Sequence, residues 1–209
     1  MKVIAVLNQK GGAGKTTVAT HLARALQVLG KSCILIDSDP QGSARDWSAV
    51  REDNQVPVVG IDRPTLERDL KSIAEHDFAV IDGAPQAADL AASAIKAADF
   101  IIIPVQPSPY DIWAASDLVD LIKGRISVTD GKLQAAFLVS RAIAGTRLGN
   151  EVGEALEGYG LPVLASRIHQ RVIYPSTAAA GKTALDVELG GDASTEFLAL
   201  GREIMGLMV

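Results

Sequence analysis

The sequence predicts a three-layer α/β fold in which helices flank a mostly parallel central sheet. Short β-branched apolar runs without polar alternation recur along the chain, as expected of strands buried on both faces of a parallel sheet. Segments of helical period lie between them, and this alternation builds parallel sheets through helical crossovers. A glycine-rich loop follows the first apolar run, where a strand would pass into a helix.

Each element follows from its own pattern. Five apolar runs are predicted as strands, at residues 2–8, 32–37, 78–83, 99–105 and 134–140. Apolar residues at helical spacing predict helices at residues 18–29, 64–76, 88–98, 111–124, 146–160 and 194–208. The first helix is expected to stop at Gly30. Ligands of such sheets bind at the carboxyl ends of the strands.

Composition narrows the class of protein. The chain has 209 residues, 48% of them hydrophobic, which suits a single domain over residues 1–209. Cys33 is the only cysteine, so neither an internal disulfide nor a cysteine cage for a metal is expected. The net charge of −5 argues against a dedicated nucleic-acid binder, although a local basic face remains compatible with it. Neither a secretory signal nor a membrane-spanning run is present, so we expect a cytoplasmic protein.

The glycine-rich loop predicts a phosphate site. The strict Walker pattern fails because Gln9 occupies the first glycine position, but the end of the motif is intact. The residues expected to hold the nucleotide are Gly11, Gly12, Ala13, Gly14, Lys15, Thr16 and Thr17. Glycines let backbone N–H groups converge on phosphate oxygens, while Lys15 meets the β- and γ-phosphates and the Thr16 hydroxyl ligates Mg²⁺. A glycine-rich hairpin or a helix cap is the alternative.

A second lysine precedes this motif. Lys10 leaves the loop at its outer edge, where a side chain points away from the phosphates of its own loop. It is placed to reach phosphates held by a second copy of the protein, as an arginine finger supplied in trans does. A solvated surface lysine is the alternative.

These residues carry a family resemblance. "KGGAGKTT" resembles the deviant Walker A motif of the ParA/MinD ATPases, and "NQKGG" is similar to ParA partition ATPases. The resemblance implies a P-loop NTPase fold, ATP with Mg²⁺, and a nucleotide-sandwich homodimer that Lys10 crosses. Because the chain opens directly on the P-loop strand, no N-terminal helix-turn-helix domain is expected, and it looks like the small, ParF-like type.

Three aspartates follow predicted strands. Asp37 and Asp39 end the second strand, where carboxylates can hold Mg²⁺ through water and orient an attacking water. An Asx turn before Pro40 is the alternative. Asp82 ends the third strand in a Walker B position. The D-x-D-P-Q resemblance implies that Asp39 serves hydrolysis and that Asp37 supports the magnesium shell.

A proline-rich loop follows the fourth predicted strand. In "PVQPSPYD", prolines fix a rigid loop that cannot extend the sheet. Its "PSPxD" form is similar to the ParF-like branch, and the resemblance places Pro107 and Asp111 near the dimer face. A helix N-cap is the alternative for Asp111. Ser140 and Arg141 stand where MinD-like relatives often carry a base-contacting asparagine, so the adenine contacts stay unassigned, while the missing N-K-x-D pattern disfavours GTP.

Residues 167–182 contain basic side chains and no acid. They can follow a phosphate backbone through sequence-independent, salt-sensitive contacts, and a solvated loop with ordinary ion pairs is the alternative. The resemblance implies nonspecific DNA binding by the ATP-bound dimer, and we assign Arg167, Arg171 and Lys182 to it. His169 is interpreted as a polar neighbour.

The resemblance implies a DNA segregation ATPase. ATP drives dimer formation and DNA binding, with polymerisation as an option, and a small centromere-binding partner protein stimulates hydrolysis, so the ATP-bound protein associates with the nucleoid. Three rivals remain: a MinD-like membrane ATPase, a metabolic P-loop enzyme similar to dethiobiotin synthetase, and an ATPase that positions protein clusters. The first needs a basic amphipathic C-terminal helix, but residues 196–209 carry one arginine against two glutamates, so no membrane partner is expected.

Overall fold

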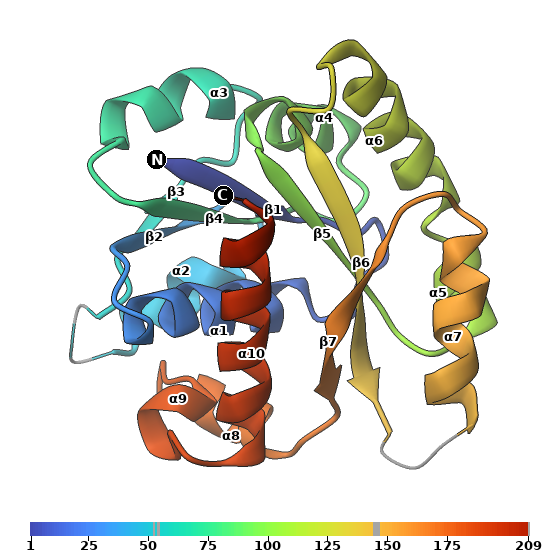
Figure 1. The fold of residues 1–209 in the computed structure, drawn as a ribbon. Coiled ribbons are helices and arrows are strands. Elements are labelled where there is room, and N and C mark those ends of the chain that lie inside the picture. The colour runs from blue at the N-terminus through green and yellow to red at the C-terminus, as the bar shows by residue number, and fades with distance from the viewer. Residues whose placement is uncertain (52, 54, 144–146, 209) are drawn as a thin grey trace.

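A seven-stranded parallel sheet forms the centre of the protein (Figure 1). The computed structural model describes residues 1–51, 53, 55–143 and 147–208. The strands are β1 (Lys2–Val6), β2 (Cys33–Asp37), β3 (Val58–Gly60), β4 (Phe78–Asp82), β5 (Phe100–Val105), β6 (Gln134–Ala142) and β7 (Val163–His169). Their order across the sheet is β3-β2-β4-β1-β5-β6-β7. The predicted fold class is confirmed.

Helices cover both faces of the sheet (Figure 1). The α-helices are α1 (Lys15–Val28), α2 (Ser43–Ala49), α3 (Leu66–Asp69), α4 (Ala88–Ala97), α5 (Pro109–Trp113), α6 (Ser116–Val128), α7 (Arg147–Glu157), α8 (Ile173–Ala178), α9 (Ala184–Val187) and α10 (Asp192–Leu207). A 3₁₀ helix, η1 (Leu70–Ile73), follows α3. Alternate residues of β1 enter opposite cores, because strand side chains point in turn to each face.

The core on one face joins α1, α2, α9 and α10 to the sheet, and the core on the other joins α3, α4, α6 and α7. The apolar side of α10 lies in the first core, where Phe197, Leu200 and Ile204 are fully buried. Among the residues that the structure describes, no helix combines the length and apolarity needed to cross a bilayer. The amphipathic pattern at the C-terminal end therefore serves the core.

Several boundaries differ from the sequence prediction. The expected helix at 64–76 is one α-turn followed by a 3₁₀ turn, and the expected helix at 111–124 is divided into α5 and α6. All five predicted strands form, whereas β3 and β7 were missed. β3 has only three residues, and β7 lies at the sheet edge with several half-buried or exposed side chains, so neither shows a continuous apolar run.

Candidate active site

The glycine-rich loop joins the end of β1 to the start of α1, at the carboxyl edge of the sheet (Figure 1). Gly12 and Gly14 have φ angles of 77° and 88°, and Gly14 is the N-cap of α1. Glycine adopts this left-handed backbone without the Cβ clash that other residues meet. The two glycines thus allow the tight turn that a phosphate-binding loop requires.

Donors from neighbouring strands and loops hold the carbonyl groups of this loop. The Gly12 oxygen accepts hydrogen bonds from Gln106 Nε2 and Arg141 Nη1, each at 3.0 Å, and the Ala13 oxygen accepts one from the Ser140 hydroxyl at 3.2 Å. Within the described chain, the backbone N–H groups of residues 11–14 donate no hydrogen bond. Open N–H groups at a helix N-terminus fit phosphate oxygens.

Lys15 places a cation beside these N–H groups. Its side chain is largely buried, and its Nζ donates to the Lys10 carbonyl oxygen at 3.1 Å. Burial lowers the pKa of Lys15, while the Asp82 and Asp39 carboxylates raise it. A buried ammonium held by one carbonyl can gain further charge-assisted hydrogen bonds from an anionic ligand.

Asp82 ends β4, directly beside the P-loop strand. It pairs in register with Val6 of β1 and with Asp37 of β2, so the two carboxylates end adjacent strands. Burial raises the pKa of Asp82 to about 7, and the nearby Asp37 raises it too, whereas the Thr16 hydroxyl and Lys15 lower it. In the part of the chain that is described, neither Asp82 oxygen has a hydrogen-bond partner. Such buried oxygens next to the Thr16 hydroxyl suit a hydrated Mg²⁺ ion.

Asp37 and Asp39 shape the turn after β2. Asp37 accepts hydrogen bonds from the backbone N–H groups of Asp39 and Arg45, at 3.0 and 2.8 Å, and the Arg45 guanidinium lies 3.4 Å away. The alternative Asx turn therefore forms. Asp39 makes a second one, accepting from the Gln41 N–H at 3.0 Å, but its half-buried side chain lines the large cavity beside Lys15.

Lys10 lies at the outer edge of the loop. Its Nζ forms an ion pair with Asp111 Oδ2 at 2.8 Å, and its side chain is 40% exposed. Asp111 lies in the first turn of α5, where Ser108 is the N-cap, so the alternative of an Asp111 N-cap is wrong. The carboxylate is buried, and its Oδ1 has no partner among the described residues. Pro107 precedes this helix, as expected for the proline-rich loop.

A cavity of about 960 Å³ opens next to the phosphate loop, within the range of small-molecule sites. Its lining includes Gly11, Gly12, residues 14–18, Asp39, Ser43 and Pro85. A second side comes from the β6–β7 end of the sheet, with Ser140, Arg141, Ile143, residues 168–172, Tyr174, Pro175 and Ala178. Tyr174, Pro175 and Val172 give this second side apolar surface, which suits a nucleoside more than a phosphate chain.

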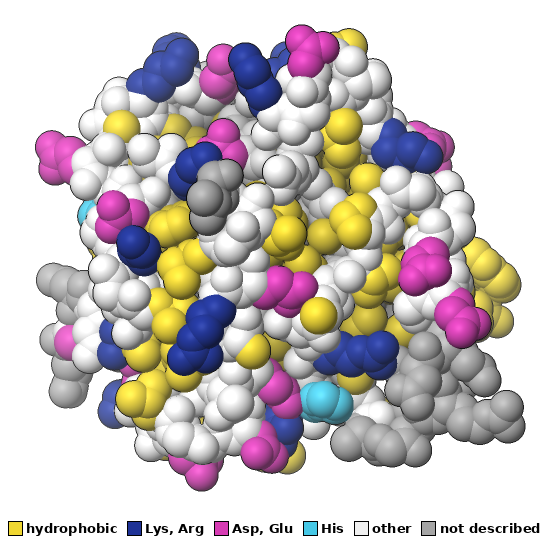
Figure 2. Space-filling view, in the orientation of Figure 1, with side chains coloured by type: hydrophobic (Ala, Val, Ile, Leu, Met, Phe, Trp, Pro, Cys, Tyr) yellow, Lys and Arg dark blue, Asp and Glu magenta, His cyan; other side chains and the backbone are white. Residues whose placement is uncertain are grey.

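The basic segment is structured and largely ion-paired. Residues up to His169 belong to β7, and residues 173–178 form α8. Arg171 pairs with Glu196 at 2.6 Å and Asp192 at 3.1 Å. Figure 2 shows positive, negative and histidine side chains close together in this lower part of the molecule, around the ends of β7 and α10. A uniformly basic face is absent from this view.

The other two residues assigned to DNA differ in their setting. Arg167 is half-buried on β7, where it pairs with Val139 of β6. Lys182 has an exposed side chain, whereas its backbone carbonyl accepts the Trp47 indole N–H at 3.2 Å. Gly181 packs against α2, because a Cβ there would lie 2.6 Å from the Trp47 carbonyl oxygen. The backbone of Gly181 and Lys182 thus packs against α2 and accepts a hydrogen bond from it.

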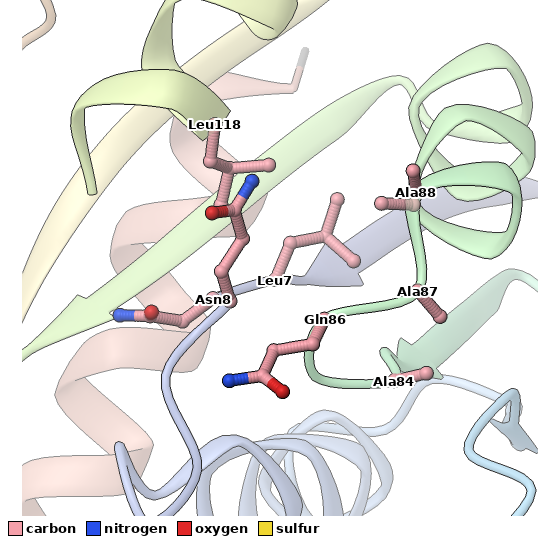
Figure 3. A pocket seen from close by; sticks show the side chains of 9 residues that line it. Leu7, Asn8, Ala84, Gln86, Ala87, Ala88 and Leu118 are labelled. Atoms are coloured by element: carbon pink, nitrogen blue, oxygen red, sulfur yellow. The ribbon is translucent and has the colours of Figure 1, made fainter. Parts of the chain in front are cut away.

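A second, smaller hollow of about 270 Å³ lies behind the start of the loop (Figure 3). Its lining residues are Leu7, Asn8, Gln9, Ala84, Gln86, Ala87, Ala88, Ala91 and Leu118. Figure 3 shows that Gln86 and Asn8 come from two different loops and that alanines of the α4 end form one wall. The volume is too small for a nucleotide, which belongs in the larger cavity.

Sequence reasoning missed the wall formed by residues 168–178. The rule that ligands bind at carboxyl ends of strands would have placed this segment at the site, had β7 been recognised. From the sequence, Arg141 stands out only by its place after the predicted strand 134–140, and no role follows from that. Its guanidinium supports the phosphate loop, and its φ of 52° is unusual for a side chain of this size.

Comparison with known proteins gives a family. Residues 4–184 match the model of the CobQ/CobB/MinD/ParA nucleotide binding domain. The chain is 32% identical to maintenance of carboxysome distribution protein A (McdA) of Halothiobacillus neapolitanus, over 92% of this chain and 91% of that protein. It is 28% identical to the chromosome partitioning protein ParA of Myxococcus xanthus, over 98% of this chain and 88% of that protein.

Solved structures share the fold. An ATP complex of a Cyanothece McdA variant gives a TM-score of 0.77 at 17% identity, covering 99% of this chain and 96% of that chain. MinD of Pyrococcus horikoshii with Mg-ADP gives a TM-score of 0.75 at 18% identity, covering 100% and 98%.

Proposed function

Because the chain belongs to the CobQ/CobB/MinD/ParA nucleotide-binding family and is a ParA-family ATPase, we propose that it positions a cargo through cycles of ATP-driven dimerisation and hydrolysis. The observation that carries this proposal is the open phosphate loop, with a buried lysine and an unpartnered carboxylate beside it. Homologues bind ATP or ADP with Mg²⁺, and the site is built for the same ligands.

Each side chain has a proposed task. The N–H groups of residues 11–14 and the Lys15 ammonium hold the phosphates, and Thr17 completes the loop. When bound, Mg²⁺ would be held by the Thr16 hydroxyl and, through water, by the Asp82 and Asp37 carboxylates. The ion would neutralise charge on the phosphates. Asp39 orients the attacking water, because it lines the cavity beside Lys15.

Lys10 acts in trans. Its outward position supports contact with nucleotide held by a second copy, which requires the ion pair with Asp111 to open. In the folded chain by itself, the buried Asp111 carboxylate is the partner that keeps Lys10 beside its own loop. ATP therefore shifts the population from separate chains to the closed homodimer through contacts that exist only in the latter.

The nucleoside lies on the far side of the large cavity. We place the adenine between Arg141 and the wall of Val172, Tyr174 and Pro175, since these residues line that end of the cavity. Apolar surface with few polar groups is typical of base and cofactor sites.

DNA segregation is the first candidate for the cargo process. The ParA relative supports it, and the "PSPxD" loop supports a ParF-like type. In this proposal the ATP-bound dimer binds DNA nonspecifically through Arg167, Arg171 and Lys182. A centromere-binding partner then stimulates hydrolysis. Polymerisation of the dimer is compatible with this cycle and is not required for it. Lys182 has the most exposed side chain of the three, whereas Arg171 must share its charge with Glu196.

Positioning of a protein assembly is the second candidate. It is favoured by the 32% identity to a protein whose name refers to carboxysome distribution. The chemistry of the ATP site is the same in both candidates, so the cargo has to be identified through the partner. A membrane-bound, MinD-like role has less support, because the apolar face of α10 is buried in the core.

The test is ATP hydrolysis by the purified protein, alone, with DNA, and with DNA plus the product of the neighbouring gene. We expect slow basal hydrolysis that rises when both are added, and none in Lys15→Ala. A partner that binds a specific DNA site supports segregation, whereas one that binds a protein assembly supports the second candidate. Hydrolysis equal in the wild type and Lys15→Ala would refute the assignment of the site.

A further inference from the structure

Helix α5 carries two large aromatic side chains that face solvent. Tyr110 is 74% exposed and Trp113 is 64% exposed. Their rings contact each other edge to face, with centroids 5.5 Å apart. Figure 2 shows hydrophobic side chains protruding at the right edge of the molecule, where Figure 1 places α5. Tyrosine and tryptophan are the residues most enriched at the energetic centres of protein interfaces, so this aromatic pair indicates a contact surface.

The aromatic pair is fixed in place relative to the phosphate loop. Asp111 lies in the same short helix and forms the 2.8 Å ion pair with Lys10. Gln106, just before the helix, donates to the Gly12 carbonyl oxygen at 3.0 Å. Two polar contacts thus join α5 and the segment before it to the outer edge of the loop. Whatever approaches Lys10 closely must also meet the surface around α5.

The small hollow of Figure 3 is lined by the residues just before Lys10 in the chain. Gln9 and Asn8 line it, one and two residues before Lys10, and Leu118 of α6 lines it from the helix that follows α5. Most of its other lining residues are alanines and a leucine. Lys10 thus follows residues that line an apolar hollow, and its ion-pair partner Asp111 belongs to the helix that carries the exposed aromatic rings.

We propose that Tyr110 and Trp113 form part of the contact between two copies of this chain in the ATP-bound state. The inference rests on the proposed function, because it takes the second copy to be the partner that Lys10 reaches. A twofold interface brings the same surface from both copies together, so each aromatic residue acts twice. Each ring buries about 150–250 Å² when covered, which would give the contact an apolar centre beside the charged phosphates.

The two tryptophans of the chain make the proposal measurable. Trp47 is 7% exposed and hydrogen-bonded, whereas Trp113 is exposed, so Trp113 should supply most of the acrylamide-quenchable fluorescence. The difference between the wild type and Trp113→Phe isolates its signal without altering Trp47. With Mg²⁺ and a non-hydrolysable ATP analogue, we expect the quenching constant of Trp113 to fall at least twofold. ADP should leave it unchanged.

Substitution gives the second readout. Tyr110→Ala with Trp113→Ala should weaken ATP-dependent dimerisation by roughly tenfold or more, as expected for a hot spot, and leave binding of ATP to the single chain unaltered. Val128→Ala, at a 70% exposed residue of α6, is the matched control and should dimerise as the wild type does.

The outcomes separate the two proposals. If light scattering shows a wild-type dimer in which Trp113 stays fully quenchable, or if the double variant dimerises normally, the contact assigned to α5 is wrong while the ATP-driven dimer stands. If the wild type binds the analogue and remains a single chain, the dimer itself is wrong, and the contact is overturned with it.

Discussion

Two regions at the same edge of the sheet differ in whether their polar groups have hydrogen-bond partners. Around the phosphate loop, the N–H groups of residues 11–14 and the oxygens of Asp82 lack partners within the described structure. Around β7 and α10, most of the described polar groups bond to one another, and Arg171 Nε is the exception. Glu196 alone contacts His169, Arg171 and the Tyr174 hydroxyl.

The difference separates binding from scaffolding. Buried polar groups are normally hydrogen-bonded, so the two buried, unpartnered oxygens of Asp82 indicate that a ligand completes the set. A closed network adds rigidity and holds a wall in place. Glu203 illustrates this second case, since its carboxylate accepts the N–H groups of Ala165 and Ser166 on the edge strand β7.

The largest effect is expected at Asp39, on the open side. Asp39→Ala should lower kcat for ATP hydrolysis roughly 1,000-fold, within the range for loss of a group that positions or activates the attacking water. Affinity for ATP should change less than about threefold, because the phosphates are held elsewhere. Single-turnover hydrolysis and calorimetric titration measure the two quantities. Unaltered turnover would make Asp39 a turn residue only.

Lys15→Ala should come next. Removing the buried ammonium takes away charge-assisted hydrogen bonds to phosphate, which predicts a loss of ATP affinity of at least roughly 100-fold in titration calorimetry. Lys31→Ala, at an exposed lysine just after α1, is the control and should bind as the wild type does. Equal affinity in all three proteins would remove the P-loop assignment.

His21 joins the two regions and predicts a pH dependence of stability. Its Nδ1 contacts the Thr17 carbonyl oxygen, and its Nε2 accepts the Ala184 N–H. Burial lowers the pKa of His21 to about 4, against about 6.5 when unfolded. Below pH 6.5 His21 is therefore protonated in the unfolded chain, whereas in the folded chain it stays neutral until about pH 4. The stability that neutral His21 provides should be complete above pH 6.5 and fall by about 3 kcal/mol towards pH 4.

Urea unfolding between pH 4.5 and 7.5, in the wild type and in His21→Gln, measures this contribution. Carboxylates elsewhere titrate in the same range and affect both proteins, so the difference between the two curves is the informative quantity. Parallel curves would contradict the buried, neutral histidine.

Glu196→Ala tests the closed side and should have the smallest effect. It leaves His169 and Arg171 without their shared acceptor, which should lower the free energy of unfolding by about 2 kcal/mol, since Arg171 is partly solvated. Because Glu196 belongs to the network around β7 and α10, we expect the variant to hydrolyse ATP at a near-normal rate at low temperature. Glu75→Ala, at an exposed position after η1, is the control. A large loss of hydrolysis in a stably folded Glu196→Ala protein would show that this network also acts in catalysis.

The open region was the more predictable from sequence. Glycines, lysines and strand-end aspartates there are required by chemistry at fixed spacing, so the loop, Asp39 and Asp82 could be placed without coordinates. The wall of residues 168–178 could not, because β7 lacks a continuous apolar run and its role depends on its place at the sheet edge. The ion pairs of Arg171 were equally hidden, since Glu196 is 25 residues away in the chain.

The short elements were hidden for a related reason. α5 and α6 read as one helix by periodicity, and only tertiary contacts separate them, with Asp111 turned to Lys10 and Leu118 in the core. The Lys10–Asp111 pair joins residues 101 positions apart. No spacing rule within one sequence identifies such a partner.

The central claim is that two copies close over ATP and that Lys10 of each reaches the other. Light scattering of the wild type and Lys10→Ala, each saturated with Mg²⁺ and a non-hydrolysable ATP analogue, tests it most directly. We predict twice the single-chain mass for the wild type and the single-chain mass for Lys10→Ala. The affinity of a single Lys10→Ala chain for the analogue should lie within about threefold of that of a single wild-type chain. A Lys10→Ala protein that dimerises and hydrolyses ATP as the wild type does would contradict the account.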